Sequence, residues 1–145
     1  MAASSKTIVD PEFGSLKYCV DAWNGLVPFT FEPSRTTHFT VQLKAPASGP
    51  TEAQQAVYRE LKVHYEELWP SIADALVECC GEAITAEDLA GLLNPVVGLY
   101  MIEDFDDPQQ AEFELVYDLN RPNEPGKALF VRLHSWEIVE AVMAD

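Results

Sequence analysis

The stretch 36-TTHFTVQLK-44 decides the fold, because polar and apolar residues alternate strictly along it from His38 to Lys44. Phe39, Val41 and Leu43 would share one face of a strand, and the polar residues between them would share the other. Such alternation is typical of an antiparallel strand that buries only one of its faces. We therefore expect a sheet with one buried side and one polar side.

Two further strands are predicted upstream, over residues 15–20 and 26–31. Asn24 and Gly25 lie between them, and Asn-Gly is the strongest short signal for a type I′ hairpin turn. Together with the alternating stretch, these two strands would form a three-stranded meander. Residues 1–14 contain Pro and Gly breakers, so they are predicted to be a flexible N-terminal arm.

A helical region is predicted after this meander. Thr51 is a good N-cap, and Gln54 completes a capping box with it. Apolar residues then recur at helical spacing between residues 57 and 68. Pro70 is expected to break or kink this helix, and it is well placed to begin a second one. A further short helical turn could begin near Thr85.

Strands are predicted again in the last part of the chain. They cover residues 96–103, 112–118, 128–133 and, in the tail, 136–142. A short helix is the alternative for the tail, because its apolar residues fit neither period well. Strands, then helices, then strands, joined by short connections, indicate an α+β fold. We expect residues 15–145 to form one domain, with an antiparallel sheet in the order βββ-αα-βββ(β) and the helices packed on one face.

The charge of the chain is strongly negative and unevenly distributed. Residues 1–50 are neutral overall, whereas residues 51–145 carry the entire net charge of −15. Such a field repels nucleic-acid phosphates and anionic membranes, and it steers a basic protein toward the surface. The alternative is that the acidity serves solubility alone. We expect a basic protein partner, no nucleic acid and no membrane, and the sequence carries no signal for an oligomeric state.

No catalytic signature occurs in the sequence. The motifs of serine hydrolases, phosphate-binding loops, dinucleotide-binding folds and zinc proteases are all missing. Cys19, Cys79 and Cys80 lack the spacing of a zinc site, and we expect them to be reduced thiols. We therefore expect a binding protein with no catalytic residue, no metal and no cofactor. The first ten residues lack the features of a secretory signal, which predicts a cytoplasmic protein.

The acidic run 103-EDFDD-107 is the most prominent candidate site. Its aspartates alternate as in a calcium loop, but the Gly and the final Glu of an EF-hand are missing. We expect an exposed hairpin tip, either solvated or facing a protein partner, and the alternative is a weak cation site. Trp23 is also expected at the surface, next to the predicted hairpin turn. The predicted partner-binding residues are Glu103, Asp104, Asp106, Asp107, Glu112, Glu114, Asp118 and Trp23.

Three segments together resemble a class of bacterial proteins. They are Trp23-Asn24-Gly25 followed by Pro28-Phe29, the helix start TEAQQ with its end ELWP, and the closing Trp136-Glu137-Ile138-Val139. In these segments the chain is similar to small α+β domains among the immunity proteins of contact-dependent and type VI secretion toxin systems. The resemblance implies a cytoplasmic protein that neutralises a cognate toxin by occupying its active site. The alternative is a non-catalytic protein-binding domain with no toxin partner.

Overall fold

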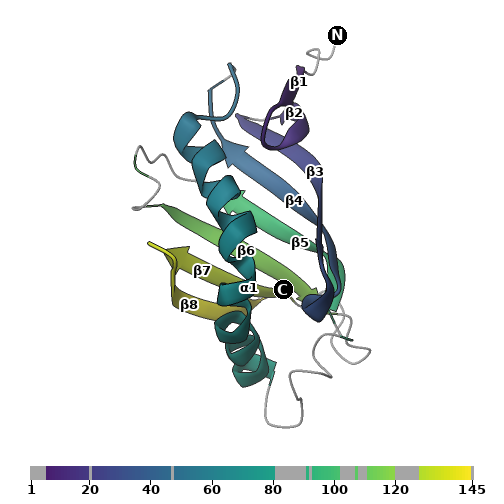
Figure 1. The fold of residues 1–145 in the computed structure, drawn as a ribbon, viewed down its shortest axis with the longest axis vertical. Helices are drawn as coiled ribbons and strands as arrows, with labels where there is room; N and C mark the ends of the chain where they lie inside the picture. The colour runs from purple at the N-terminus through teal and green to yellow at the C-terminus, as the bar shows by residue number, and fades with distance from the viewer. Residues whose placement is uncertain are drawn as a thin grey trace.

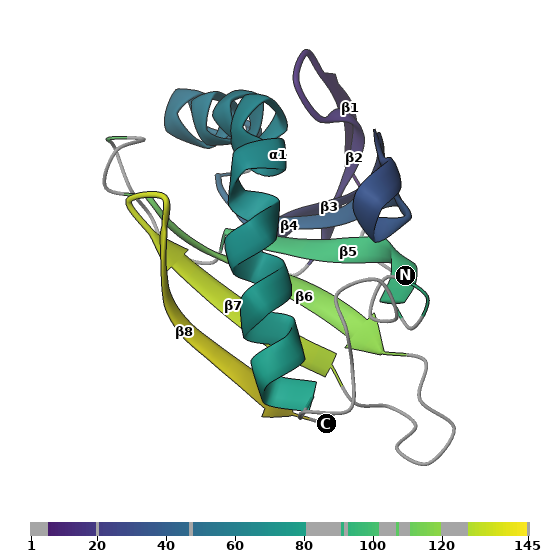
Figure 2. The same ribbon diagram turned by 60° about the horizontal axis from the view of Figure 1, so that its bottom comes forward.

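The described residues form one twisted sheet with a long helix across one of its faces, as the computed structural model shows (Figure 1, Figure 2). The structure describes residues 6–19, 21–46, 48–80, 91, 93–101, 107, 111–119 and 128–144. The strands are β1 (Thr7–Asp10), β2 (Gly14–Cys19), β3 (Ala22–Phe31), β4 (Thr36–Lys44), β5 (Leu93–Met101), β6 (Glu112–Leu119), β7 (Ala128–His134) and β8 (Glu137–Ala144). The helix is α1 (Glu52–Cys80), and a short 3₁₀ helix, η1 (Glu32–Ser34), joins β3 to β4.

The eight strands lie side by side in their order along the chain. Every neighbouring pair is antiparallel except β4 and β5, which run parallel with His38 opposite Val96 and Leu43 opposite Met101. The sheet is therefore mixed, and the expected antiparallel sheet in the order βββ-αα-βββ(β) is wrong. The cause is α1: a parallel pair needs a crossover of about a dozen or more residues, and the helix between β4 and β5 provides one.

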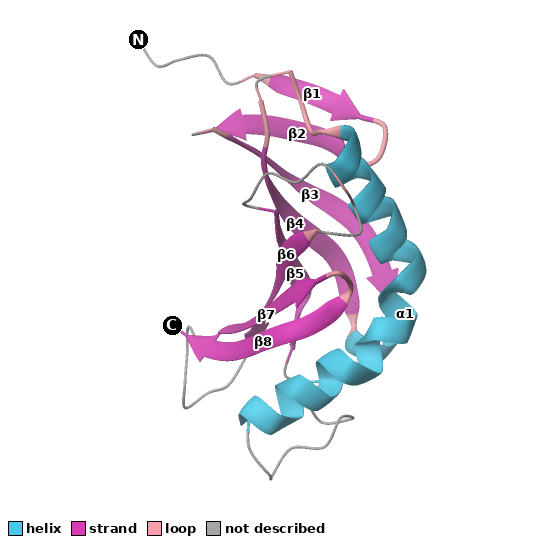
Figure 3. Cartoon of the chain, turned by 90° about the vertical axis from the view of Figure 1, so that its left-hand side faces the viewer, coloured by secondary structure: helices cyan, strands magenta, loops and turns pink. Residues whose placement is uncertain are grey.

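A single helix replaces the two that the sequence predicts on either side of Pro70. In the described residues α1 runs continuously for 29 residues, with Pro70 inside it. Proline removes one backbone hydrogen bond and crowds the preceding turn, and both effects bend a helix. Figure 3 shows α1 changing direction along its length while it stays on the same face of the sheet. The predicted pair of helices is therefore one bent helix.

The first hairpin turns earlier than the sequence predicts. β3 runs straight through Asn24 and Gly25, so the hairpin turn expected at these residues is wrong. The turn includes Asp21, whose φ of 65° is the left-handed conformation that a tight turn uses. Gly25 has a different role, because a Cβ atom there would lie 2.7 Å from both the Ser15 carbonyl oxygen and Leu16 Cδ2.

Substituting Gly25 by alanine should weaken the packing of β3 against β2. The added methyl group would collide with backbone as well as with a side chain, and overpacking of this kind costs about 1–3 kcal/mol. Urea denaturation should therefore give a lower free energy of unfolding. The control is Gly91→Ala, where an added Cβ atom meets nothing within 4 Å. Equal stabilities for the two variants would contradict this role of Gly25.

The N-terminal strand is tied to the helix by Asp10. β1 lies within residues 1–14, the predicted flexible arm, and pairs antiparallel with β2. The buried Asp10 carboxylate accepts hydrogen bonds from the backbone N–H groups of Glu12 and Phe13. It also accepts one from the Gln55 side chain on α1, at 2.7 Å. Part of the predicted arm is thus an ordered edge of the sheet.

The later strands lie close to where the sequence predicts them. β6, β7 and β8 match the last three predicted strands, so the tail is a strand and not a short helix. β5 begins at Leu93, three residues before the predicted start at residue 96. The helical turn predicted near Thr85 lies outside the described residues.

The start of α1 confirms the predicted capping box. The Thr51 hydroxyl accepts a hydrogen bond from the Gln54 backbone N–H at 3.1 Å, and the Gln54 side chain accepts one from the Thr51 backbone N–H at 2.9 Å. The Gln54 side-chain amide also donates to the Lys44 carbonyl oxygen at 2.8 Å. The cap therefore fixes where α1 begins and ties that point to the end of β4.

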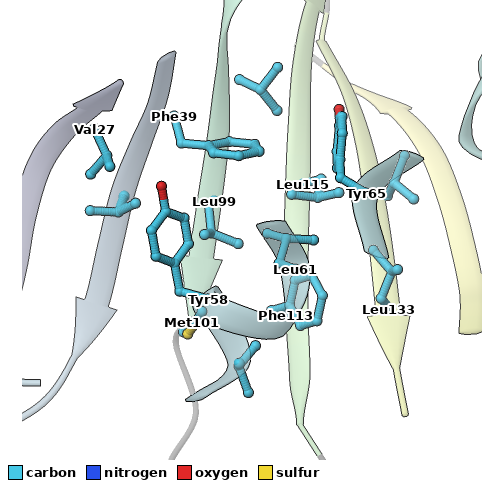
Figure 4. Packing of buried hydrophobic residues seen from close by; sticks show 14 of the residues in the cluster. Val27, Phe39, Tyr58, Leu61, Tyr65, Leu99, Met101, Phe113, Leu115 and Leu133 are labelled. Carbon is cyan, nitrogen blue, oxygen red and sulfur yellow. The ribbon is translucent and has the colours of Figure 1, made fainter. Parts of the chain in front are cut away.

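The core lies between α1 and the sheet face that α1 covers (Figure 4). Tyr58, Leu61 and Tyr65 of α1 are buried there together with Leu115 of β6. The Tyr65 hydroxyl makes a 2.6 Å hydrogen bond with the Tyr117 hydroxyl, also buried. This bond gives each hydroxyl a partner in a place that water does not reach.

Candidate functional site

The face of the sheet turned away from α1 is the candidate site, and we call it the open face (Figure 3). Successive side chains of a strand point to opposite faces, so every second residue contributes to it. In β4, for example, Thr40, Gln42 and Lys44 are exposed on the open face, whereas the residues between them are buried on the helix side. The open face is therefore the polar side that the alternation of residues 36–44 predicts.

One row of polar side chains crosses the open face at a single level, and we call it the polar row. The strand register places these residues opposite one another from β2 to β8: Lys17, Asn24, Gln42, Tyr100, Glu114, Arg132 and Glu140. Shallow depressions lie at the two ends of the row, one beside Lys17 and one beside Arg132. The row therefore links residues from seven strands.

Arg132 lies among three carboxylates at the acidic end of the polar row. Its guanidinium nitrogens are 3.2 Å from Glu114, 3.6 Å from Glu140 and 3.8 Å from Glu112. The hydrogen bond to Glu114 raises the pKa of Arg132 above its ordinary value, and the other carboxylates act in the same direction. The four side chains are partly exposed, so water screens these ion pairs. The contacts orient the side chains more than they stabilise the fold.

Tyr100 lies next to these carboxylates and folds back over Gly98. A Cβ atom at Gly98 would lie 3.0 Å from the Tyr100 hydroxyl and 3.2 Å from Val116 Cβ, so the absence of a side chain leaves room for the ring. Burial raises the pKa of Tyr100, and the carboxylates of Asp118 and Glu114 raise it further. The hydroxyl is therefore neutral at physiological pH and can donate a hydrogen bond on an acidic surface.

A second row, beside the polar row, is largely apolar, and we call it the apolar row. From β3 to β8 it consists of Leu26, Thr40, Gly98, Val116, Phe130 and Val142. Leu26 is 59% exposed and Val142 is 44% exposed, and Phe130 beside Val142 is half-buried. Leu26 lies four strands away from the neighbouring Phe130 and Val142, and exposed apolar side chains of this kind are candidate contacts for a partner.

The two sides of the open face differ in charge. Strands β2–β4 contribute Lys17 and Lys44 to it and contain no carboxylate, and we call this side the lysine half. Strands β6–β8 contribute one cation, Arg132, and five carboxylates, and we call this side the glutamate half. Its carboxylates are those of Glu112, Glu114, Asp118, Glu137 and Glu140.

The structure brings together three of the predicted partner-binding residues. Glu112, Glu114 and Asp118 all lie on the open face of β6, because they are spaced by two or four residues along one strand. Asp107 is described and exposed. The other predicted acidic residues lie outside the described part of the chain; they are Glu103, Asp104 and Asp106.

Trp23 does not lie on the open face, and its predicted exposure is wrong. Its side chain is 0% exposed, and its indole N–H donates to the Pro46 carbonyl oxygen at 2.9 Å. The error follows from the misplaced turn. Because β3 runs through Asn24 and Gly25, Trp23 lies within a strand and not beside a turn. The side chains of a strand alternate between its two faces, and that of Trp23 is directed into the core.

Reasoning from the sequence missed the lysine half and Arg132. Lys17 and Gln42 lie far apart in the sequence and become neighbours of Asn24 only through the strand register. A signal did exist for Arg132, since it is the only charged residue of the predicted strand 128–133. A cation in that position is well suited to a cross-strand pair with an acidic neighbouring strand.

The remaining candidate groups are the cysteines and possible metal ligands. Cys19 is an exposed thiol beside Lys17 on the open face, and Cys79 is a thiol whose Sγ lies 3.6 Å from the Ala141 carbonyl oxygen. Burial raises the pKa of Cys79. In the described part of the chain, no three His, Cys, Asp or Glu side chains gather closely enough to hold a metal ion. The same part contains no helix long and apolar enough to cross a bilayer.

The open face has to be interpreted from its own geometry. No protein-family model matches the chain, and neither a protein of curated function nor a solved structure similar to it was found. What the face offers is a group of carboxylates, a tyrosine hydroxyl and an adjoining apolar row. These groups are suited to holding a basic, partly apolar protein surface.

Proposed function

We propose that this protein binds a basic protein through its open face, and that the partner is a toxin which it neutralises. The observation that supports this most is the glutamate half, where five carboxylates lie on a sheet face that no described element covers. Exposed apolar side chains lie directly beside them. A partner rich in Arg and Lys would find opposite charge and apolar contact on the same surface.

Inhibition by such a surface follows from charge complementarity. A toxin that acts on an anionic substrate needs a basic active site, and a group of carboxylates is complementary to that site. The negative field also speeds the encounter at low salt. Arg132 illustrates how this surface holds a guanidinium, since three carboxylates lie within 3.8 Å of it. An arginine of the toxin would meet the same kind of surroundings.

A binding role also agrees with the surroundings of His38, one of the two described histidines on this face. The Thr37 hydroxyl lies 2.9 Å from His38 Nδ1, at an exposed position. An activated nucleophile needs a further group that orients the base, and catalysis benefits from a site that excludes water. We therefore propose a non-catalytic protein, and we place it in the cytoplasm, as the resemblance to immunity proteins implies.

Co-expression with the product of the adjoining gene tests this proposal. The protein should rescue growth and co-purify with that product. The variant Asp118→Lys/Glu140→Lys reverses two exposed open-face charges, so it should lose rescue and bind at least about tenfold more weakly, which is about 1.4 kcal/mol. The control Glu66→Lys/Asp74→Lys changes the net charge equally on exposed positions of α1 and should still rescue growth.

Two outcomes would contradict the proposal. Full rescue by the open-face variant would show that the toxin binds elsewhere. If the adjoining gene product is harmless and does not co-purify, the protein is a binding domain without a toxin partner.

A further inference from the structure

The open face is complementary to itself in charge. The lysine half and the glutamate half lie on opposite sides of β5, the fifth of eight strands. On this face β5 carries Val96, Gly98 and Tyr100, none of which is charged at physiological pH. A surface of this kind can pair with a copy of itself when a twofold axis in the interface exchanges the two halves.

An axis that runs along β5 makes this exchange. β4 of one copy then faces β6 of the other, β3 faces β7, and β2 faces β8. Because the axis is parallel to the strands, each residue keeps its level, so the polar row faces the polar row and the apolar row faces the apolar row. Sheets packed face to face lie about 10 Å apart, and their strands cross at no more than about 30°. Because this angle is small, residues near the axis stay opposite the residues named here.

Opposite charges meet on both sides of this axis. Every lysine of the lysine half lies opposite a glutamate of the second copy, and each pair occurs twice because the contact is symmetric. The oppositely charged facing pairs are Lys17 with Glu140 and Lys44 with Glu112. At the other positions His38 faces Asp118, and the neutral Gln42 and Asn24 face Glu114 and Arg132. A charge pattern of this kind fixes the register of an interface and disfavours other partners.

In the same arrangement, the apolar row of one copy faces the apolar row of the other. Leu26, which is 59% exposed, faces the half-buried Phe130 of the second copy. The two Tyr100 rings, which lie over Gly98, meet at the axis. Aromatic and apolar anchors near the centre, surrounded by polar groups, are the usual anatomy of a specific protein interface.

We propose that two copies of this chain pack through their open faces, with the twofold axis along β5. The second copy covers Leu26, Phe130 and Val142, which are otherwise in contact with water. The dimer does not depend on the proposed toxin. Where both exist, the toxin has to displace the second copy to reach the glutamate half.

The net charge of −15 is compatible with this dimer. Exposed carboxylates of α1, such as Glu66 and Asp74, lie on the opposite side of the sheet from the interface. Exposed charges farther apart than the Debye length, about 8 Å at physiological ionic strength, are largely screened from each other. The charges closest to the second copy therefore matter most. Among them Lys17 and Lys44 face Glu140 and Glu112 of the second copy, and Glu114 keeps its ion pair with Arg132 of its own chain.

Charge-swapped variants test the position of the axis. Lys17→Glu/Lys44→Glu reverses the lysine half, and Glu112→Lys/Glu140→Lys reverses two positions of the glutamate half. Either variant alone places like charges opposite each other, so its dimer Kd should rise at least about tenfold. An equimolar mixture restores opposite charges at every one of these positions, so it should form a heterodimer. Analytical ultracentrifugation measures all three samples.

A substitution in the apolar row gives a second, independent test. Leu26→Arg places a charge against Phe130 of the second copy and should give a monomer, whereas Val63→Arg, at a 71% exposed position of α1, should stay dimeric. Both positions are exposed in the single chain, so circular dichroism should show that each variant is folded.

The unmodified protein should sediment as a dimer at a concentration of about 100 μM. Interfaces of standard size have Kd values in the micromolar range or below, so this concentration is high enough to populate the dimer. A monomer at that concentration would overturn the proposal. So would a dimer that persists in both charge-reversed variants and in Leu26→Arg. A monomer that still binds the toxin would contradict the dimer alone and leave the proposed function intact.

Discussion

Replacing Trp23 by alanine should lower the free energy of unfolding by about 3–5 kcal/mol, a large share of the stability of a domain of this size. The indole is fully buried and lies 5.0 Å, centroid to centroid, from the Tyr18 ring. Alanine would leave a cavity and would also remove one of the two hydrogen bonds that the Pro46 carbonyl oxygen accepts, the other coming from the Gly49 backbone N–H. Urea denaturation followed by circular dichroism measures the loss, and an unchanged m-value shows that the transition remains comparable.

The control for this prediction is Trp136→Ala. Trp136 is only half-buried, so its removal exposes less apolar core, and alanine keeps the same positive φ of 68° so that the backbone strain is unchanged. Its removal should therefore cost clearly less than the removal of Trp23. If both tryptophans gave the same loss, or if Trp23→Ala cost under about 1 kcal/mol, Trp23 would not be the packing residue described above.

Raising the pH above about 10 should unfold the protein, because three core tyrosines resist ionisation only while the chain is folded. Burial raises the pKa of Tyr65 to about 12, and burial together with the Glu12 carboxylate raises that of Tyr58 to about 12. Burial, and then the neighbouring Tyr65, raise the pKa of Tyr117 well above its ordinary value.

The sign of the effect follows from these directions. Below pH 10 the tyrosines are neutral in both states, so their contribution to stability is fully present. Between about pH 10 and 12 the unfolded chain loses protons that the folded chain keeps, and stability falls as the pH rises. For Tyr65 alone, the rise of the pKa from its ordinary value of 10.0 to about 12 corresponds to a loss of about 3 kcal/mol in the free energy of unfolding.

Tyrosinate absorbance and circular dichroism, recorded together during an alkaline titration, test this prediction. The buried tyrosines should ionise in the same pH interval in which the secondary structure is lost. Tyr65→Phe should make the fall of stability with pH shallower, since one proton fewer is released on unfolding. Complete ionisation of every tyrosine near pH 10 with the fold intact would contradict it.

Local patterns predicted some elements of this fold correctly. The alternation in residues 36–44 places Phe39, Val41 and Leu43 in the core, and the capping box at Thr51 forms as the sequence indicates. Both features depend only on residues close together in the chain. The parallel pairing of β4 with β5 depends instead on how α1 packs across the sheet, and no local pattern records that.

The errors at Asn24-Gly25 and Pro70 have a common cause, because tertiary packing overrode a local preference. Asn-Gly is a strong turn signal, but Gly25 is needed where β3 passes close to the Ser15 carbonyl oxygen. Pro70 is a strong helix breaker, but apolar residues on both sides of it, Leu61 and Leu76, pack into the same core and retain the helix.

The candidate site was predictable only in part. The acidic side chains of Glu112, Glu114 and Asp118 share a face because of their spacing along one strand, and spacing is visible in the sequence. The contacts of Glu112 and Glu114 with Arg132, and the lysine half on the other side of β5, follow from the order and register of the strands. Register between distant strands is set by the complete sheet, so the sequence alone did not reveal it.

The parallel contact between β4 and β5 also has a consequence for how the chain folds. Within β1–β4 and within β5–β8, each strand pairs with the next one along the chain. The contact between β4 and β5 instead joins residues separated by the whole of α1. Closing so long a loop costs conformational entropy, and the strand pairing offsets this cost only after the loop has closed. Two half-sheets can therefore arise quickly while their union is the slow step. Until that union occurs, the inner edges of both half-sheets are open to pairing with another chain.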